Sequence, residues 1–553
     1  MCGSLATLVL LSALASSLGY TRKGGMSDPV VQTRLGKLRG SLLETWTGKP
    51  VLGFRGVRYA KPPLANLRFM PPVPLEPWNG IADATKDGSI CPQPGGDYFG
   101  PSSEDCLILN VYTKQLDGNK PVIVFIHPGG FFSATSRSDW SGPDYLLDQD
   151  IVLVTVHYRL GPLGFLSTGD GQVVGNAGMK DQVLALRWVR DNIANFGGDP
   201  NSVTIAGYSA GSTSVMLHML SPMSKGLFHR GIAMSAGATS NWVVNENPLE
   251  LAKRLAGIVG CPVSVSSKEL VDCLRKVPAD VISDEAYKKL PDLQRQTYYA
   301  LVVEPDRGDG AERFLTDHPK NIIMSKNFAH VPLVVGIIEN EFDFLLRRTL
   351  QNETWLNILN TDFETIAPIY FVYESGTEKS KQFSRKLRHF YLGDKPVTKE
   401  DFRKVGMISS DAFVIVGQEE SAKLFAKYSR APVYFYMTTY VGRFSNEVDE
   451  KTKKPLGAAH HDELIYLFYN AKQFPDRFST TDPEAKTVRR LTTLFSNFAE
   501  KGDPTPSGVS VKWAPMRLDN LQYMEIGEEL TMKKGLPYPE RMALWEMIYP
   551  KIE

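Results

Sequence analysis

Long apolar runs and an excess of charge of either sign are both missing from this chain of 553 residues. After the N-terminal segment, no stretch reaches the ~20 consecutive apolar residues that a membrane-spanning helix needs. The chain carries 62 Lys and Arg against 61 Asp and Glu, a formal net charge of +1. This balance argues against nucleic acid or an anionic membrane surface as the main partner. We interpret the short basic run at 451–455 as a solvated loop.

Linkers are also missing, because no Gly/Ser run, Pro-rich tract or internal repeat follows the N-terminal segment. Length alone would suggest three or four domains of ~150 residues. Without boundaries between them, we instead expect one large domain over residues 20–553. Residues 1–19 combine an apolar stretch with small residues, which is typical of a secretory signal peptide, although the usual Lys or Arg before that stretch is missing. We therefore expect a secreted, extracellular protein, and Asn352, in the only N-x-S/T sequon, is a candidate glycosylation site.

Cysteine is scarce, with five residues in all, and Cys2 would leave with the signal peptide. The other four form two local pairs, Cys91 with Cys106 and Cys261 with Cys273. Pairing neighbours as disulfides would close two short loops, each worth about 3 kcal/mol in an oxidising compartment. The alternative, a zinc site, is disfavoured because the chain has no C-x-x-C and no histidine within a few residues of these cysteines. We expect no bound metal.

Strand-like runs precede a serine motif. "PVIVFIH" at 121–127 and "IVLVTVHY" at 151–158 lack polar alternation, which is typical of strands buried on both faces of a parallel sheet. A third run, "SVTIAGY", leads into G-x-S-x-G around Ser209, and "AGSTSVMLHML" behind it is predicted to be a helix. A serine at such a junction indicates a nucleophile elbow rather than an ordinary turn. Gly207 and Gly211 are expected to avoid collisions between strand and helix.

A serine nucleophile needs a base, an acid that orients the base, and donors for developing negative charge. "HPGGFFS" places Gly129 and Gly130 after a predicted strand, although a plain turn explains two glycines equally well. Either histidine of "GAAHHDEL" at 457–464 can be the base. The acid can be Glu339, Glu341 or Asp343, which follow another predicted strand. These residues alone do not choose among the candidates.

In this order, the motifs resemble the cholinesterase and carboxylesterase family of α/β-hydrolases, and most of all its secreted insect carboxylesterases. The resemblance runs from "GKLRGSLLETWTGKPVLGFRGVRYAKPP" to near the C-terminus and is densest in "GNAGMKDQVLALRWVRDNIANFGGDPNSVTIAGYSAGS", with "SEDCLILNVY" as a second landmark. It implies an α/β-hydrolase fold, with a large, mostly parallel twisted sheet flanked by helices. It also implies a cofactor-free serine carboxylesterase that acts on small-molecule esters and is inhibited by organophosphates and carbamates.

Carried over position by position, the resemblance selects a triad. Ser209 is the nucleophile, and Glu341 is the acid because it lies five residues after Gly336. The family pattern G-x-x-H, which begins here at Gly457, selects His460 as the base. This order, Ser then Glu then His, is that of an α/β-hydrolase.

The resemblance also assigns supporting residues. The oxyanion donors are the N–H groups of Gly129, Gly130 and Ala210, and Pro128, which has no N–H, replaces a glycine that is not a donor. Ser235 supports the acid, and the family's cysteine pattern matches the two local pairs. The residues expected around the substrate pocket are Trp242, Phe131, Phe132 and Tyr208.

Departures from the family pattern bear on the substrate. Tyr208 stands where many relatives have Glu and juvenile hormone esterases have Gln, which disfavours a specific juvenile hormone esterase. The loop between Cys91 and Cys106 lacks the Trp of cholinesterases, and its Tyr98 and Phe99 replace that ring only in part.

Phe342 and His461 stand where relatives often have glycine, which makes the packing next to the acid and the base an open question. The alternatives are a juvenile hormone esterase, a cholinesterase-like hydrolase or a non-catalytic adhesion protein. A complete set of site residues disfavours the last of these. The sequence does not predict the oligomeric state.

Overall fold

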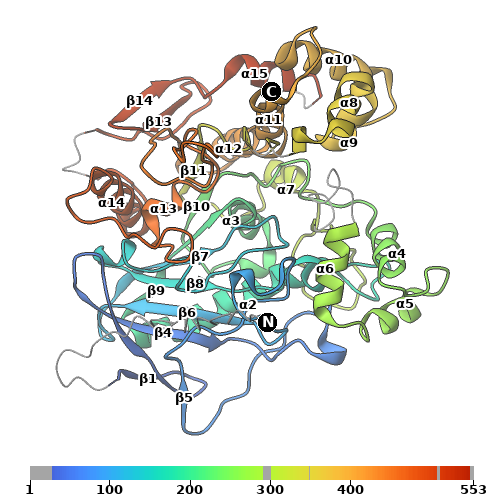
Figure 1. Cartoon of the computed structure of the whole chain (residues 1–553). Helices are drawn as coiled ribbons and strands as arrows, with labels where there is room; N and C mark the ends of the chain where they lie inside the picture. The colour runs from blue at the N-terminus through green and yellow to red at the C-terminus, as the bar shows by residue number, and fades with distance from the viewer. Residues whose placement is uncertain (1–27, 290–299, 345, 348, 507–510, 549–553) are drawn as a thin grey trace, which may run out of the picture.

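The computed structural model describes residues 28–289, 300–344, 346–347, 349–506 and 511–548 (Figure 1). The predicted signal peptide lies outside the described residues. The central element is an 11-stranded sheet in the order β14-β13-β12-β11-β10-β9-β7-β8-β6-β4-β3. Strands β8 to β13 of this order pair in parallel, and both edges are antiparallel. The sheet is therefore the large, mostly parallel one that the sequence predicts.

The strands of the main sheet are β3 (Ser41–Glu44), β4 (Pro50–Arg58), β6 (Ile108–Thr113), β7 (Lys120–Ile126), β8 (Val152–Val156), β9 (Gly198–Tyr208), β10 (Arg230–Met234), β11 (Leu333–Ile338), β12 (Val433–Thr438), β13 (Gln522–Ile526) and β14 (Leu530–Lys534). A small second sheet contains β1 (Val30–Gln32), β2 (Lys37–Arg39) and β5 (Ile81–Asp83). The α-helices are α1 (Gly161–Phe165), α2 (Ala177–Asn192), α3 (Ala210–Leu220), α4 (Pro248–Ile258), α5 (Ser267–Leu274), α6 (Ala279–Lys289), α7 (Pro319–Ser325), α8 (Glu353–Thr361), α9 (Phe363–Tyr370), α10 (Glu378–Leu392), α11 (Phe402–Ser410), α12 (Val416–Tyr428), α13 (Leu464–Leu467), α14 (Ala485–Lys501) and α15 (Pro539–Trp545).

Helices cover both faces of the main sheet. In β7, Val122 and Val124 enter one apolar core, which includes side chains of α2 and α3, while Ile123 and Phe125 enter a second core with side chains of α14. A strand covered on both faces has no solvent side, so its sequence shows no polar alternation. The predicted strands at 121–127, 151–158 and 202–208 are confirmed as β7, β8 and β9. No helix in the described ranges is both long and apolar enough to span a bilayer.

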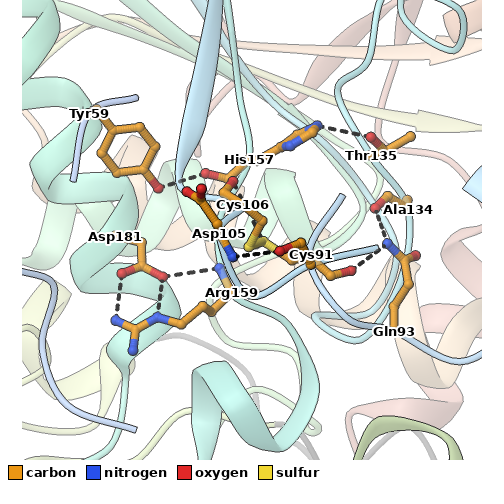
Figure 2. The surroundings of a disulfide bond; sticks show 11 residues. Tyr59, Cys91, Gln93, Asp105, Cys106, Ala134, Thr135, His157, Arg159 and Asp181 are labelled. Carbon is orange, nitrogen blue, oxygen red and sulfur yellow. Dashed lines mark hydrogen bonds and ion pairs between the residues drawn. A yellow bond between two sulfur atoms is a disulfide. The ribbon is translucent and has the colours of Figure 1, made fainter. Parts of the chain in front are cut away.

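Both predicted disulfides are present. Cys91 joins Cys106 across 15 residues, and Cys261 joins Cys273 across 12 residues. The loop closed by the first disulfide is tied to the segment after β7, because the side-chain amide of Gln93 donates to the carbonyl of Ala134 at 3.0 Å (Figure 2). The crosslink therefore holds this loop close to the residues that follow β7.

A buried ion pair joins the segment that follows β8 to helix α2. The Asp181 carboxylate accepts hydrogen bonds from Nε and Nη2 of Arg159 at 2.8 and 2.7 Å, and from the Arg159 backbone N–H at 3.0 Å (Figure 2). The two side chains are only 3% and 0% exposed. Removing one partner would leave the other charge buried without compensation.

Replacing Arg159 with Met should lower the free energy of unfolding by about 3–5 kcal/mol, because the Asp181 carboxylate stays buried. The matched control is Arg58→Met, since Arg58 pairs with Asp105 through a side chain that is 54% exposed. That change should cost less than about 1 kcal/mol. Urea unfolding followed by circular dichroism measures both, and equal midpoints for the two variants would contradict the assignment.

Candidate active site

Ser209 lies on a sharp turn between β9 and α3. Its φ of 55° and ψ of −120° are strained for a residue with a side chain. The turn is held from both sides: the Ser209 N–H donates to the carbonyl of Met234 at 2.7 Å, and the Ser209 carbonyl accepts from the N–H of Thr213 at 3.0 Å. The predicted junction of strand, serine and helix is present, with α3 at its expected bounds.

Two glycines make this turn possible. A Cβ at Gly207 would lie 2.2 Å from the carbonyl oxygen of Gly211, and a Cβ at Gly211 would lie 2.1 Å from that of Ile126. Both distances are far below van der Waals contact. The expectation that these glycines avoid collisions with the neighbouring strand and helix is confirmed.

The structure brings one histidine and one carboxylate together. Nδ1 of His460 lies 2.5 Å from Oε2 of Glu341, and the other oxygen of Glu341 accepts the backbone N–H of Ile338 at 2.9 Å. Both side chains are buried. Of the other acid candidates, Glu339 is exposed, and Asp343 instead accepts a hydrogen bond from Ser410 at 2.6 Å. The pair that the family resemblance selects is the pair in contact.

Burial decides the protonation of this pair. It lowers the pKa of His460 from 6.5 to about 3. It raises the pKa of Glu341, and hydrogen bonds from the Ile338 N–H and the Ser235 hydroxyl oppose that rise. Nε2 of His460 is buried without a hydrogen-bond partner among the described residues, so it is available to accept a proton.

Three aromatic rings enclose the imidazole of His460. Ring centroids lie 4.4 Å away for Phe342, 4.3 Å for His461 and 4.9 Å for Tyr208. Phe342 and His461, the two departures from glycine, therefore pack against the base without displacing it from Glu341. Because Tyr208 directly precedes Ser209 in the chain, its ring contact places His460 beside the serine turn.

The loop after β7 carries Gly129 and Gly130, two of the three residues whose N–H groups are expected to face the oxyanion, and Ala210 begins α3. Gly129 and Gly130 have φ values of 111° and 59°, and a Cβ at Gly129 would lie 2.0 Å from the carbonyl oxygen of Ser133. The N–H groups of Gly129, Gly130 and Ala210 donate no hydrogen bond within the described part of the chain. Three free donors of this kind can receive a negatively charged oxygen.

The residues expected around the substrate pocket occupy different environments. Trp242 borders a cavity of about 610 Å³ and donates its indole N–H to the carbonyl of Phe413 at 2.8 Å. Phe132 is half-buried. Phe131 and Tyr208 are fully buried. Phe131 packs within the core, and the ring of Tyr208 packs against those of His460 and His461, so neither side chain borders the cavities near the site.

A second cavity, of about 260 Å³, begins beside Gly129 and is bordered by Tyr98, Phe99, Trp140 and His461. The ring of Trp140 lies 5.5 Å from that of Tyr98 and 4.7 Å from that of Phe99. The tryptophan that the disulfide loop lacks is thus supplied by a different segment. Sequence reasoning missed Trp140, because only the folded chain brings it to this loop.

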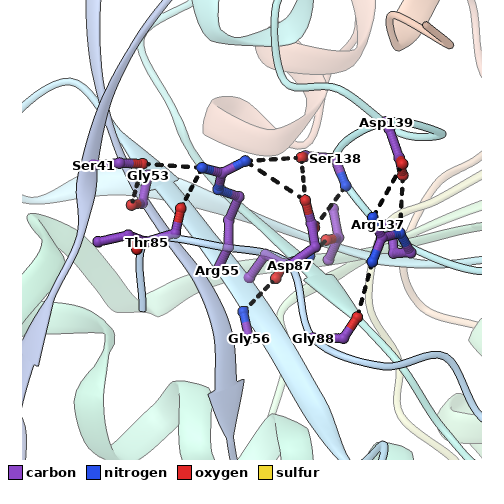
Figure 3. Close-up of polar contacts among 12 residues, drawn as sticks. Ser41, Gly53, Arg55, Gly56, Thr85, Asp87, Gly88, Arg137, Ser138 and Asp139 are labelled. Carbon is purple, nitrogen blue, oxygen red and sulfur yellow. Dashed lines mark hydrogen bonds and ion pairs between the residues drawn. The ribbon is translucent and has the colours of Figure 1, made fainter. Parts of the chain in front are cut away.

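Polar contacts hold the segment that carries Trp140 (Figure 3). The Ser138 N–H donates to Asp87 at 2.8 Å, and Nη1 of Arg137 donates to the carbonyl of Gly88 at 3.0 Å. Nη1 of Arg55 in β4 also donates to the Ser138 hydroxyl at 3.2 Å. These hydrogen bonds therefore fix the segment that places Trp140 in the aromatic wall of the cavity.

A mostly parallel sheet with a serine on the turn after β9, followed in the chain by an acid and a histidine in contact, defines an α/β-hydrolase. The model of the Carboxylesterase family matches residues 27–545, and the chain belongs to this family. The resemblance drawn from the sequence is confirmed, and the protein is a carboxylic ester hydrolase.

Insect esterases are among its relatives. Juvenile hormone esterase of Tribolium castaneum is 34% identical, over 91% of this chain and 88% of that protein. Esterase E4 of Myzus persicae is 35% identical, over 92% and 93%. The crystal structure of juvenile hormone esterase from Manduca sexta, with OTFP covalently attached, superposes with a TM-score of 0.84 at 28% identity and covers 95% of this chain and 100% of that one.

The buried imidazole generates a pH prediction. With His460 as the expected base, hydrolysis would need its neutral form, and because burial lowers the pKa of His460 we expect protonation to stop hydrolysis only at a pH below the ordinary histidine value of 6.5. We expect kcat/KM for an aryl ester to stay constant from neutral pH down to this value and to fall below it. A pH–rate profile at constant ionic strength measures this, and an acid limb centred above 6.5 would contradict the prediction.

Proposed function

We propose that the protein hydrolyses carboxylic esters through an acyl-enzyme on Ser209, with His460 as the base and Glu341 as the acid. The observation that carries this proposal is the buried His460–Glu341 pair next to the strained serine turn, with Nε2 of His460 unpartnered. The strained turn is the geometry that exposes a nucleophilic hydroxyl in this fold.

In the first half-reaction, Nε2 of His460 takes the Ser209 proton as Oγ attacks the ester carbonyl carbon. Glu341 accepts the Nδ1–H hydrogen bond, which fixes the tautomer and stabilises the imidazolium as it forms. The carbonyl oxygen becomes negative and is held by the free N–H groups of Gly129, Gly130 and Ala210. Losing one such donor typically costs about 2.7–4 kcal/mol of barrier.

The first half-reaction ends when His460 gives its proton to the leaving alcohol oxygen and the tetrahedral intermediate collapses to the acyl-enzyme. In the second half-reaction, His460 takes a proton from a water molecule that attacks the acyl carbon. It returns that proton to Oγ of Ser209 as the second tetrahedral intermediate collapses to the carboxylic acid. The products are a carboxylic acid, an alcohol and the free enzyme, and no cofactor takes part.

The cavity beside Gly129 suggests where the alcohol half binds. Because His460 protonates the leaving oxygen, the alcohol must lie on the side of the base, and His461, whose ring lies 4.3 Å from that of the base, borders this cavity. Its aromatic wall favours apolar alcohols. Among the described residues that border it, none is an aspartate or glutamate to attract a cation. We therefore propose esters of apolar alcohols as the substrates.

Three further assignments complete the proposal. We assign residues 20–553 to a single domain and residues 1–19 to a signal peptide for secretion. We assign a glycan to Asn352, which is exposed and begins α8. Its side-chain oxygen caps the helix by accepting the Thr354 N–H at 2.9 Å, which leaves the amide nitrogen as the glycan attachment point.

Covalent labelling tests the nucleophile. After treatment with an organophosphonate ester, mass spectrometry should find the label on the Ser209 peptide, and Ser209→Ala should take no label and lose at least about 10⁴-fold in kcat on an aryl butyrate. Ser221→Ala is the matched control, because Ser221 follows the other end of α3. It should label and turn over like the unaltered protein. A folded protein that takes no label would refute the proposal.

The glycan has its own test. The protein secreted from insect cells should lose the mass of one N-glycan on treatment with peptide-N-glycosidase, and Asn352→Gln should show no such loss. Activity should be unaffected, since Asn352 does not border the two cavities near the site. A glycosidase-sensitive mass shift that persists in Asn352→Gln would show that the assignment is wrong.

A further inference from the structure

Glu341 lies on a turn that is bound on one side by the segment of the base. We call residues 339–344, which directly follow β11, the acid turn. The N–H of His460 donates to the carbonyl of Glu341 at 3.2 Å. The N–H of Asn340 donates to the carbonyl of Ala458 at 3.0 Å. The contact between the carboxylate and the imidazole therefore depends on where the acid turn lies.

The other side of the acid turn is bound by Ser410, the last residue of α11. The Ser410 hydroxyl accepts the backbone N–H of Phe342 at 2.8 Å and donates to the carboxylate of Asp343 at 2.6 Å. These are the two residues that follow Glu341 in the chain. Ser410 is 0% exposed and Asp343 is 3% exposed, so water does not compete for the bond between them. A single hydroxyl therefore holds both residues that come after the acid.

Two more residues of α11 belong to this contact. Arg403, Gly406 and Ser410 are separated by three and four residues, which places them on one face of the helix. A Cβ at Gly406 would lie 2.1 Å from the carbonyl oxygen of Asp343, so a side chain at this position is excluded. Nη2 of Arg403 donates to the side-chain oxygen of Asn340 at 2.6 Å. Helix α11 therefore contacts the acid turn both before and after Glu341.

A π-helical turn, Asp411–Ile415, follows α11 and leads into α12. Turns of this kind are rare and occur frequently at functional sites. Within it, the carbonyl of Phe413 accepts the indole N–H of Trp242 at 2.8 Å. Asp411 is fully buried and accepts Nε of Arg541, from the C-terminal helix α15, at 2.8 Å. The helix is therefore held in place directly after the residue that binds the acid turn.

Helix α12 is in turn anchored to the main sheet. Nε2 of Gln418, which is fully buried, donates to the carbonyl of Ala233 in β10 at 3.0 Å and to that of Gly336 in β11 at 2.8 Å. Strand β11 is the strand from which the acid turn leaves the sheet. The Ser410 hydroxyl is thus fixed relative to the same strand that carries Glu341.

We propose that Ser410 is a positioning residue for the hydrolysis, whose hydroxyl holds the acid turn so that Glu341 stays in contact with His460. The proposal rests on the function proposed above. Without the hydroxyl, the Phe342 N–H and the Asp343 carboxylate lose this partner, and the turn shifts to find others. The 2.5 Å contact between Glu341 and Nδ1 of His460 then lengthens, which matters most when the imidazole is protonated. Ser410 borders neither cavity near the site, so it acts on kcat rather than on ester binding.

The variant Ser410→Ala removes only the hydroxyl. We expect kcat on an aryl butyrate to fall about 10- to 100-fold with KM within about twofold, because a displaced acid weakens the transition state and not the binding of the ester. Ser410→Thr keeps the hydroxyl and should recover kcat to within about fivefold of the unaltered protein, although its added methyl group lowers the melting temperature. Circular dichroism establishes that each variant is folded. Equal losses of kcat in both variants would show that packing, and not the hydroxyl, is responsible.

Ser384→Ala is the matched control. Ser384, on α10, is also 0% exposed, and its hydroxyl donates to the carbonyl four residues earlier, that of Ser380 at 2.9 Å, as the Ser410 hydroxyl does to Gly406 at 3.3 Å. Its described hydrogen bonds stay within residues 364–384, away from the acid turn. This variant should keep the kcat of the unaltered protein, even if its melting temperature falls as much as that of Ser410→Ala. A purely structural role for Ser410 predicts the same kcat for both variants.

A double-mutant cycle with Glu341→Gln isolates the route through the acid. Once the carboxylate is absent, holding the acid turn no longer supports the protonated imidazole. Adding Ser410→Ala to Glu341→Gln should therefore lower the remaining kcat by less than about twofold. Equal losses of kcat in the two backgrounds would overturn the proposed route.

The outcomes separate this inference from the proposed function. If the unaltered protein takes no phosphonate label at Ser209, the proposed function has failed. If it labels normally, but Ser410→Ala changes kcat by less than about twofold, the function stands and the positioning role of Ser410 is wrong. A loss of kcat that Ser384→Ala does not share, that Ser410→Thr restores and that disappears in the Glu341→Gln background supports the role.

Discussion

The site depends on one steric constraint, the contact between backbone segments at the serine turn. The carbonyl oxygen of Ile126, the last residue of β7, lies where a Cβ on Gly211 would be only 2.1 Å away. The carbonyl oxygen of Gly211 in turn lies where a Cβ on Gly207, near the end of β9, would be only 2.2 Å away. No side chain fits between them, so the first turn of α3 lies directly against the carboxyl ends of two parallel strands. The strain at Ser209 and the N–H of Ala210, which donates no hydrogen bond in the described part of the chain, both follow from this close approach. The other site residues also follow the carboxyl ends of strands, Gly129 after β7, Ser235 after β10 and Glu341 after β11. This is where open parallel sheets bind their ligands.

Local pattern was enough to predict the strands and the turn. The runs at 121–127 and 151–158 are buried on both faces, and burial of that kind leaves a continuous apolar signal in the sequence. The glycines on either side of Ser209 and the short spacings between cysteines are equally local.

Local pattern does not identify the acid, because Glu339, Glu341 and Asp343 have similar chemistry and nearly the same position in the chain. Only the packing of the segment after β11 against the His460 loop distinguishes them, and the residues alone do not encode that contact in any short-range pattern. The family resemblance supplied the choice, and the structure brings the chosen pair into contact. Trp140 had no signal of either kind, because it reaches Tyr98 and Phe99 only through the fixed segment around Ser138.

Three of the departures from the family pattern form one packed group around His460. Phe342 and His461, which occupy positions where glycine is frequent, place their rings 4.4 and 4.3 Å from the ring of His460. Tyr208 completes the enclosure and takes up the N–H of His461. Together the three rings surround the imidazole of His460. The group excludes water from the His460–Glu341 hydrogen bond, which strengthens it because the local dielectric constant is low.

A neutral phenol at position 208 fits the electrostatics better than a charged group would. Glu341 and Glu463 are already buried, and a third carboxylate beside them would add a charge whose desolvation nothing nearby offsets. A cation there would stabilise ionised Glu341, but its field would also act on His460 and disfavour the imidazolium that forms when Ser209 loses its proton. A phenol accepts the hydrogen bonds of the Ser235 hydroxyl and of the His461 N–H without adding a charge. Among the described contacts of Glu341 and Glu463, every hydrogen bond comes from a hydroxyl, a backbone N–H or the imidazole of His460, and none from an arginine or lysine. The acid side of the site is therefore built from neutral donors, which stabilise a carboxylate while leaving it free to hold the proton of the base.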